Sequence, residues 1–204
     1  GSNGLALFSK YPIKTGSSGM VSLRDYSTLS RRDFLYSVLE IEGKELFVGC
    51  THLTANLTDS APYEGKFTGW EQENLKKSEY LLTKIEELSQ GRPQAIMGDF
   101  NFSPGVPNQG IEANFEKSFL AFKAKGYVDP MSDGAKPSCT FCKSNSLNLA
   151  TDPNQLIDHI FLKNVPQKNV GGAEIIMDQK IETKNSIKTN LSDHYGIKVK
   201  VNLF

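Results

Sequence analysis

The sequence of 204 residues has no long apolar run and no excess of charge of either sign. Its longest apolar stretches are short, as at 46–48 and 95–97, whereas a membrane-spanning helix needs roughly 18 to 20 apolar residues. The 23 basic and 23 acidic residues cancel, so there is no basic surplus of the kind that drives nonspecific DNA binding. These absences argue against a transmembrane helix and, more weakly, against a nuclease that binds DNA regardless of sequence.

Cysteine is also scarce, with only Cys50, Cys139 and Cys142 in the chain. Three cysteines cannot form a fully paired framework, and one Cys-x-x-Cys pair is only half of a structural zinc site. A local or intermolecular disulfide and free thiols both stay open. Internal repeats and low-complexity tracts are lacking as well. With 38% hydrophobic residues, the chain is long enough to form one domain, 1–204, with a sizeable core.

Histidine is scarce too, and all three histidines stand beside apolar runs. Histidine near a carboxylate is the usual way to build a general acid or base that works near neutral pH. His52 and His194 are therefore candidates for chemistry. His159 precedes Ile160 and Phe161, and we expect it to be a hydrogen-bonded structural residue.

The apolar run at 95–97 ends abruptly on Gly98-Asp99-Phe100-Asn101. A carboxylate and an amide at the end of a strand can hold a metal ion or a phosphate, although the same residue types also end strands simply as turn formers. Three other runs end in the same manner, because His52, Asp158 and the pair Asp193-His194 also stand at their ends. Several oxygen ligands and two histidines at strand ends favour a functional site.

Apolar periodicity predicts strands at 5–9, 34–41, 46–51, 94–98, 156–161, 173–177 and 195–203. Helices are expected over 70–90 and 111–125. Residues 42–44 are expected to join two of the strands as a hairpin. The charged residues of the first helix are expected to form a solvated face, while Phe115, Phe119, Leu120 and Phe122 form the apolar face of the second. The strand-helix-strand order over 46–98 predicts a helix packed on the outside of a sheet.

Four segments in this order resemble the endonuclease/exonuclease/phosphatase superfamily: Thr51-His52-Leu53, Gly98-Asp99-Phe100-Asn101, Ile157-Asp158-His159-Ile160-Phe161 and Ser192-Asp193-His194. The opening residues 4–13 are similar to a further stretch of its members. The superfamily includes DNase I-like nucleases, abasic-site endonucleases, inositol polyphosphate 5-phosphatases and neutral sphingomyelinases. The resemblance implies an α/β (α+β) fold in which a two-layer β-sandwich is flanked by helices, the DNase I-like four-layer α/β/β/α arrangement.

The resemblance also implies that this domain is incomplete at its N-terminus. In the family, two strands before the stretch similar to 4–13 carry an Asn and the Glu that is the principal metal ligand, and this sequence begins after both. The chain would then be the C-terminal two-thirds or more of the family domain, with exposed apolar sheet faces and edges. We expect a fragment whose missing strands are disordered, cleaved or supplied by another chain.

The activity implied by the resemblance is a phosphodiesterase that depends on Mg²⁺, with Mn²⁺ or Ca²⁺ as alternatives, and in which water attacks in line. His194 is expected to accept the proton of the water while Asp158 holds its ring, with Asp99 as a rival base. His52 would stabilise the phosphoryl oxygens or help to protonate the leaving group. The expected catalytic residues are His52, Asp99, Asn101, Asp158 and His194, and the expected metal ligands are Asp193, Asp99 and Asn101.

The substrate implied by the flanking residues is a phosphodiester of lipid or nucleic acid. Residues 51–55 resemble the corresponding stretch of the neutral sphingomyelinase branch, which implies a sphingomyelinase-type phospholipase C. Such an enzyme would make peripheral membrane contact, for which Tyr63, Phe67 and Trp70 are the candidates, the alternative being that these three residues only cap the helix expected at 70–90. A DNase I-like or other nuclease is the alternative, although only Lys66 is near enough to line that rim. An inactive scaffold or binding subunit of the same fold is the second alternative. The sequence indicates neither compartment nor oligomeric state.

Overall fold

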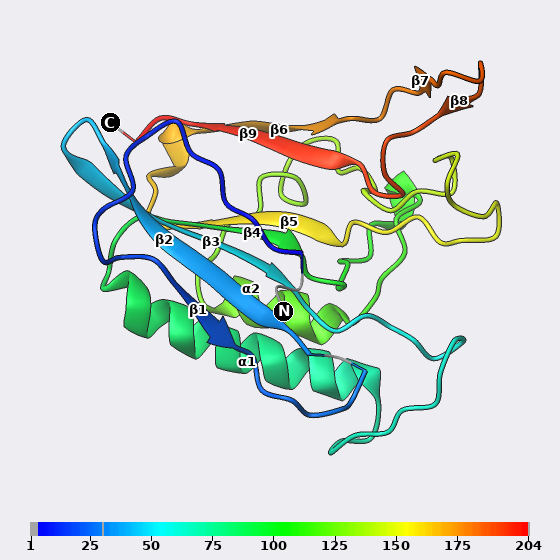
Figure 1. The fold of residues 1–204 in the computed structure, drawn as a ribbon, viewed down its shortest axis with the longest axis horizontal. Coiled ribbons are helices and arrows are strands. Elements are labelled where there is room, and N and C mark those ends of the chain that lie inside the picture. Colours follow the sequence, from blue (N-terminus) through cyan, green and yellow to red (C-terminus); the bar gives the residue numbers. More distant parts are fainter. Residues whose placement is uncertain (1–3, 30, 204) are drawn as a thin grey trace.

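The computed structural model describes residues 4–29 and 31–203, which form a mixed α/β fold (Figure 1). Its sheets are a five-stranded sheet in the order β1-β2-β3-β4-β5, a two-stranded sheet of β6 and β9, and the short pair β7-β8. The strands are β1 Gly19–Ser22, β2 Asp33–Ile41, β3 Lys44–His52, β4 Gln94–Asp99, β5 Asp158–Lys163, β6 Val170–Ile176, β7 Ile181–Glu182, β8 Lys188–Thr189 and β9 Gly196–Val201. The helices are α1 Trp70–Ser89 and α2 Glu116–Ala124, with 3-10 turns η1 Pro107–Gln109 and η2 Gln167–Asn169.

The five-stranded sheet follows from one tight hairpin and one helical crossover. β2 and β3 are antiparallel and join through Glu42 and Gly43, whose φ angles of 50° and 77° are those of the two-residue turn that suits a twisted hairpin. From β3 the chain passes through α1 and returns as β4, parallel to β3, and β5 then pairs antiparallel with β4. The last residues of β3 and β4 therefore lie beside the first residue of β5 at one end of these strands.

The main core lies between this sheet and the two helices. α1 contributes the buried residues Leu81, Leu82 and Ile85, which stand at helical spacing on one face. Phenylalanines from both sheet and helices fill the space between them, namely Phe34, Phe47, Phe100, Phe102, Phe119, Phe122 and Phe161. Burial of side chains of this size is the main stabilising contribution to such a fold.

The opposite face of the five-stranded sheet packs against β6 and β9, as Figure 1 shows. Val48, Ala95 and Leu162 of the first sheet form a second apolar cluster with Val199 and Val201 of β9. The described residues thus form three layers, which are helices, a five-stranded sheet and a two-stranded sheet. This confirms the expected α/β sandwich class, although no α-helix of the described residues covers the outer side of β6 and β9.

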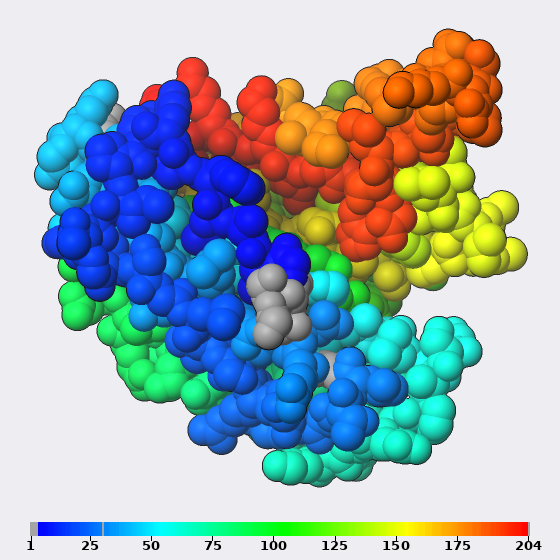
Figure 2. Space-filling model, viewed as in Figure 1, coloured from blue at the N-terminus to red at the C-terminus, as the bar shows by residue number. Residues whose placement is uncertain are grey.

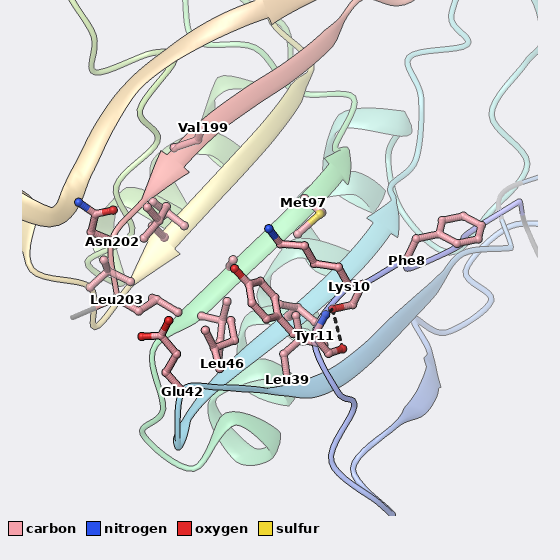
Figure 3. A pocket seen from close by; sticks show the side chains of 17 residues that line it. Phe8, Lys10, Tyr11, Leu39, Glu42, Leu46, Met97, Val199, Asn202 and Leu203 are labelled. Atoms are coloured by element: carbon pink, nitrogen blue, oxygen red, sulfur yellow. Dashed lines mark hydrogen bonds between the residues drawn. The ribbon is translucent and has the colours of Figure 1, made fainter.

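An apolar groove of about 770 Å³ lies between the two sheets, at the end remote from the strand tips described below (Figure 3). Leu39, Leu46 and Met97 line it from the five-stranded sheet, Val199 lines it from β9, and Phe8 to Tyr11 border it. Apolar sheet surface is therefore exposed, as the family resemblance implied. The further strands expected to cover it stay a prediction.

Two of the predicted strands needed correction. The strand predicted at 5–9 is wrong, because this segment is extended but forms no ladder with any described strand. Leu5 and Leu7 are half-buried while Ala6 and Phe8 are exposed, and Leu7 packs on the second cluster. The segment therefore has the alternating apolar pattern of a strand without a neighbouring strand to pair with. The strand predicted at 156–161 begins only at Asp158. β1, β7 and β8 were not predicted, because they are short and lie in polar sequence.

The helices needed corrections as well. α2 begins at Glu116 and not at 111, because Ile111 and Asn114 form isolated bridges with Val106 and Ser103. Leu120 is 53% exposed and does not belong to the apolar face of α2. The solvated face expected for α1 is also wrong in part. Glu73 and Lys77 are fully buried and form an ion pair of 2.8 Å, a burial that is tolerated only when the charges are paired and hydrogen-bonded.

Candidate active site

Three of the predicted residues form a single row across neighbouring strands. In the register of the sheet, His52 at the end of β3 lies opposite Asp99 at the end of β4, and Asp99 lies opposite Asp158 at the start of β5. The loops after β3 and β4 are joined where they leave the sheet, because the Leu53 amide donates to the Asp99 carbonyl at 2.9 Å. The row therefore follows directly from the parallel pairing of β3 and β4.

The side chains of the row share one face of the sheet. Asp99 stands two residues after Met97 and Asp158 two residues before Ile160, and both of these neighbours pack in the cluster under β9. Side chains two residues apart in a strand point to the same face, so the row faces the side of β6 and β9. At this edge Figure 2 shows a recess between the loop 56–68 and the segment 139–152.

His194 reaches the row from the loop before β9. Its Nδ1 lies 2.7 Å from Oδ2 of Asp158, and its ring packs against that of Phe141 with centroids 5.4 Å apart. Thr140 connects the two segments that carry Asp158 and His194. Its Oγ1 accepts hydrogen bonds from the amides of Ile157 and Asp158 at 3.2 and 3.1 Å, and its carbonyl accepts one from the Tyr195 amide at 2.8 Å. The Asp158–His194 pair is thus held from the backbone.

Asp99 is fixed by its own turn. Its Oδ1 accepts the amide of Asn101 at 2.9 Å, and its Oδ2 lies 3.3 Å from Nε2 of His52. Asn101 is nearly buried, has a left-handed φ of 55°, and donates from Nδ2 to the Leu53 carbonyl at 3.1 Å. The hydrogen bond from Nδ2 fixes the amide group, and its oxygen is the atom of Asn101 suited to a metal ion.

A divalent cation fits the donor set at this edge. The ligand atoms of Asp99, Asp158 and His194 lie within 4.8 Å of one another, and the amide oxygen of Asn101 belongs to the same turn. Carboxylate and amide oxygens are the ligands that Mg²⁺, Mn²⁺ and Ca²⁺ prefer. Asp193, also predicted as a metal ligand, is exposed and lies outside this group.

The titratable groups of the row have strongly shifted pKa values. Burial and the negative charge of Asp158 raise the pKa of Asp99 to about 7. Burial and the positive charge of Arg32 lower the pKa of His52 to about 4. Burial alone would lower the pKa of His194, but the hydrogen bond and charge of Asp158 outweigh it and raise the pKa to about 9. Shifts of opposite direction in one cluster are typical of sites built for acid–base work.

Arg32 is a residue that sequence reasoning missed. It lies just before β2, its Nε is buried without a hydrogen-bond partner, and its charge acts on both Asp99 and His52. Burial lowers the pKa of Arg32 itself, although Asp99 and Glu73 oppose this effect. A guanidinium with an unused donor beside the row is suited to bind an anionic oxygen. No motif pointed to it, because only the fold brings it near the strand ends.

Asn74 of α1 is a second residue that was missed. Its Nδ2 donates to the carbonyls of Thr54 and Phe100 at 2.8 and 3.0 Å, so one buried side chain holds the loops that follow β3 and β4. The buried Glu73 next to it accepts from Thr54, Lys77 and Tyr63. This network supports the row from the helix side, where the sequence suggested only solvent-exposed charge.

Several predicted residues lie elsewhere. His159 is buried, with its Nδ1 2.8 Å from Oδ2 of Asp129 and its Nε2 2.9 Å from the carbonyl oxygen of Phe102. These two contacts confirm the expected structural role. The membrane-facing role of Tyr63, Phe67 and Trp70 is wrong for Trp70, which is buried, and Tyr63 packs edge-on against it. Phe67 packs against Tyr26. Cys139 and Cys142 form a disulfide and Cys50 is free, which settles the question that the sequence left open.

No protein-family model matches the chain, and no curated protein matches its sequence. Solved structures do match. An endonuclease/exonuclease/phosphatase family protein from Bacteroides thetaiotaomicron has a TM-score of 0.62 and 17% identity, and the match covers 93% of this chain and 66% of that one. A mannosyl-6-phosphatase from the same organism has a TM-score of 0.63 and 17% identity, and the match covers 93% of this chain and 67% of that one. TDP2 of D. rerio complexed with single strand DNA product has a TM-score of 0.62 and 21% identity, and the match covers 91% of this chain and 66% of that one.

These comparisons confirm the resemblance at the level of fold. The chain has the endonuclease/exonuclease/phosphatase fold of the DNase I-like kind, and it spans about two thirds of the length of the structures it matches.

Proposed function

We propose that the chain carries the catalytic row of a phosphoester hydrolase in which a water molecule attacks phosphorus in line. The observation that carries the proposal is the row of His52, Asp99 and Asp158 on three adjacent strands, joined at its end by His194. The fold shared with proteins described as phosphatase and TDP2 supports it. Since these neighbours are under 25% identical, the activity is proposed for this chain from its own residues.

Asp99 is the group we propose to accept the proton of the attacking water. A base works best when its pKa lies near the working pH, and the pKa of Asp99 is raised to about 7. The hydrogen bond from the Asn101 amide fixes one carboxylate oxygen and leaves the other near His52. The sequence favours His194 as the base, with Asp99 as the alternative base.

His194 is better suited to carry positive charge than to accept a proton. With its pKa raised to about 9 by Asp158, the ring is an imidazolium at neutral pH and can stabilise the phosphoryl oxygens as they become more negative. His52 has the opposite property. A pKa lowered to about 4 keeps its ring neutral, so it can donate a hydrogen bond to the substrate but has no proton to give a leaving group at neutral pH.

A divalent cation is part of the proposal. Asp158 and the amide oxygen of Asn101 are the donors that would hold it, with exposed Asp193 contributing through water, while Asp99 is left free to act as the base in place of the metal role also predicted for it. When bound, Mg²⁺ supplies Lewis-acid polarisation of the phosphoryl oxygens and offsets their charge. Mn²⁺ and Ca²⁺ suit the same oxygen donors.

The two alternatives to this function make different demands on the structure. An inactive scaffold would not need an Asp–His pair at a solvent-accessible edge, yet Asp158 and His194 are each about a quarter exposed. A nuclease is supported by the DNA complex of a structural neighbour. The zero net charge of the chain supplies no general attraction for nucleic acid, so we place a nuclease second.

The test is hydrolysis of bis(p-nitrophenyl) phosphate by the natural protein that contains these residues. We expect turnover with Mg²⁺, loss of turnover with a chelator, and recovery when Mg²⁺ or Mn²⁺ is restored. Plasmid nicking and release of phosphocholine from sphingomyelin, measured in parallel, separate the nuclease from the lipid phosphodiesterase. Absence of turnover on all three substrates, together with no Mg²⁺ binding by calorimetry, would support the inactive scaffold.

A further inference from the structure

Three segments of the chain have the pattern Asn-x-Ser/Thr, at which an oligosaccharide can be attached to the asparagine. They are Asn56-Leu57-Thr58, Asn101-Phe102-Ser103 and Asn190-Leu191-Ser192. A pattern this short often arises by chance, so it predicts a modification only where the folded chain leaves room for a sugar. The surroundings of the three asparagines differ, and they separate one accessible acceptor from two that are built into the structure.

Asn101 and Asn190 belong to the interior of the protein. Their side chains have exposed fractions of 8% and 2%. The Nδ2 atom of Asn101 donates to the Leu53 carbonyl at 3.1 Å, and that of Asn190 donates to the Asp178 carbonyl at 2.9 Å. Because Nδ2 is the atom that would carry the sugar, a glycan at either position would break these contacts and displace the packed side chain. A chain glycosylated at either residue could not adopt this fold.

Asn56 has the opposite surroundings. The side chains of Asn56 and Thr58 are both exposed, and the loop 56–68 that they begin projects from the body of the molecule (Figure 1). The contact of its Nδ2 with Oδ1 of Asn114 is long, at 3.4 Å, and lies at the surface. A glycosylated Nδ2 keeps one of its two hydrogens, so the fold does not depend on leaving this nitrogen unmodified.

The local conformation at Asn56 also leaves the acceptor atom available. The hydroxyl and the amide of Thr58 both donate to Oδ1 of Asn56, at 2.7 and 3.3 Å, which is the arrangement of an Asx turn. Both hydrogen bonds use the amide oxygen, so neither competes for the nitrogen that would bond to the sugar.

The disulfide of the chain is consistent with the compartment in which asparagine is glycosylated. Cys139 and Cys142 are bonded to each other. Disulfides form and persist in oxidising compartments and are rare in the cytosol, and the enzymes that attach glycans to asparagine act on chains that enter the secretory pathway. A chain that forms this bond as it folds is therefore in contact with those enzymes.

We propose that Asn56 carries an N-linked oligosaccharide in the natural protein and that Asn101 and Asn190 do not. The donor is an oligosaccharide joined through C1 of its first sugar to a lipid diphosphate. The bond between Nδ2 and C1 forms as the bond from C1 to the diphosphate oxygen breaks. The lipid diphosphate leaves with the electron pair of that bond, and the proton lost from Nδ2 passes to solvent.

The experiment is digestion of the natural protein, purified from its own cells, with peptide N-glycosidase in heavy-oxygen water, followed by peptide mass spectrometry. The enzyme converts a glycosylated asparagine to aspartate, so we expect residue 56 to appear as heavy-oxygen aspartate while Asn101 and Asn190 stay amides. In the same cells, Thr58→Ala should abolish the modification of Asn56, whereas Thr58→Ser keeps the hydroxyl and should retain it. Asn185→Gln is the matched control, since Asn185 is exposed but lies outside the pattern.

Three results would overturn the inference: an unmodified Asn56 in the natural protein, a glycan on Asn101 or Asn190 of the folded protein, or a modified Asn56 in the Thr58→Ala variant. The modification is measured by mass and not by turnover. A failure of this inference is therefore distinguishable from a failure of the proposed function.

Discussion

At the scale of single residues, this chain holds two Asp–His pairs that differ only in their surroundings. Asp129 and His159 are both fully buried, while Asp158 and His194 lie at the accessible strand edge. The distances between ring nitrogen and carboxylate are nearly the same, 2.8 and 2.7 Å. The same chemical group can therefore serve as a core contact or as part of a site, and accessibility decides which.

This comparison makes a matched prediction. Asp158→Asn removes the charge that holds His194 as an imidazolium, so we expect kcat/KM for bis(p-nitrophenyl) phosphate to fall by about 10²- to 10⁴-fold, with a lower Tm but a folded protein at the assay temperature. Asp129→Asn should lower the Tm without a comparable loss of kcat/KM in the folded protein, because it leaves a buried histidine far from the row without its charged partner. Similar kcat/KM losses in the two folded variants would show that the pairs are not distinct.

The pKa values of the two site histidines give a second prediction for the metal-free protein. Since the pKa of His194 is raised from 6.5 to about 9, its contribution to stability is complete below pH 6.5 and is lost as pH rises through 9. The pKa of His52 is lowered to about 4, so its contribution is complete above pH 6.5 and is lost as pH falls through 4.

Ring resonances followed by NMR over this range should show the two histidines titrating at opposite ends. The urea midpoint of the wild type should also fall between pH 6.5 and 9.5 by more than that of His194→Gln. Titration of both rings near 6.5 would contradict the electrostatic description of the site.

Sequence reasoning found the residues that carry their own signal. His52, Asp99, Asn101 and Asp158 stand at the ends of apolar runs, and His194 follows Ser-Asp. Arg32 and Asn74 could not be found in this way. Their roles depend on the approach of β2 and α1 to the row, and no local pattern around either residue differs from that of an ordinary surface arginine or helix asparagine.

At the scale of secondary-structure elements, the turn 139–142 is the one that binds β5 to the loop before β9. It is closed by the Cys139–Cys142 disulfide, and Thr140 inside it is fully buried. Thr140→Val removes the acceptor for two buried amides, which should cost about 1–3 kcal/mol of unfolding free energy. It should also lower kcat, since Asp158 is one of the residues held.

Thr140→Ser is the control for this prediction, because serine keeps the hydroxyl. Urea unfolding and kcat measured for both variants test it. A serine variant as impaired as the valine variant would mean that the methyl group, and not the hydrogen bonds, is what the turn requires.

Gly98 determines whether β3 and β4 can approach closely enough to form the row. Its φ is 138°, and a Cβ built there would lie 2.0 Å from the carbonyl oxygen of Thr51. We expect Gly98→Ala to destabilise the protein by roughly 3 kcal/mol or more, measured by urea unfolding. Gly105→Ala is the comparison, since a Cβ there would lie no closer than 3.2 Å to any neighbour, the nearest being the Cβ of Ala113. Equal stability of the two variants would contradict this explanation.

Elements with strong periodicity were predictable and short elements were not. The hairpin of β2 and β3 and the helix α1 each follow a pattern over nine or more residues. Residues 5–9 have the alternation of a strand, yet a strand also needs a hydrogen-bonded neighbour, and none of the described strands pairs with it. The early start predicted for α2 fails for a similar reason, because bridges to residues 103 and 106 compete for the same backbone groups.

At the scale of the whole molecule, the described residues combine a five-stranded sheet covered by helices on one face with a second sheet of two strands and the short pair β7-β8. The order of the motifs was enough to predict this fold class, which the solved structures confirm. The resemblance also predicted exposed apolar sheet surface, for which the groove between the sheets is the candidate, while the extent of the domain stays a prediction. Among the described residues, neither α-helix is long and apolar enough to span a bilayer.

The charged residues show the limit of reading a whole molecule from composition. Equal numbers of acidic and basic residues showed only that the chain has no overall basic surplus. The fold buries Glu73 with Lys77 as an ion pair, which the composition does not reveal. Tertiary structure decides which charges meet solvent, and hence which partner the surface suits.

The most direct measurement is the rate of bis(p-nitrophenyl) phosphate hydrolysis by the natural protein and by Asp99→Asn, both with Mg²⁺ and at equal folded concentration. Asp99 stands in the middle of the row, so its loss should lower kcat by about 10²-fold or more while the Tm stays near that of the wild type. An Asp99→Asn variant that turns over at the wild-type rate would show that the strand-end row is not where the phosphoester is cleaved.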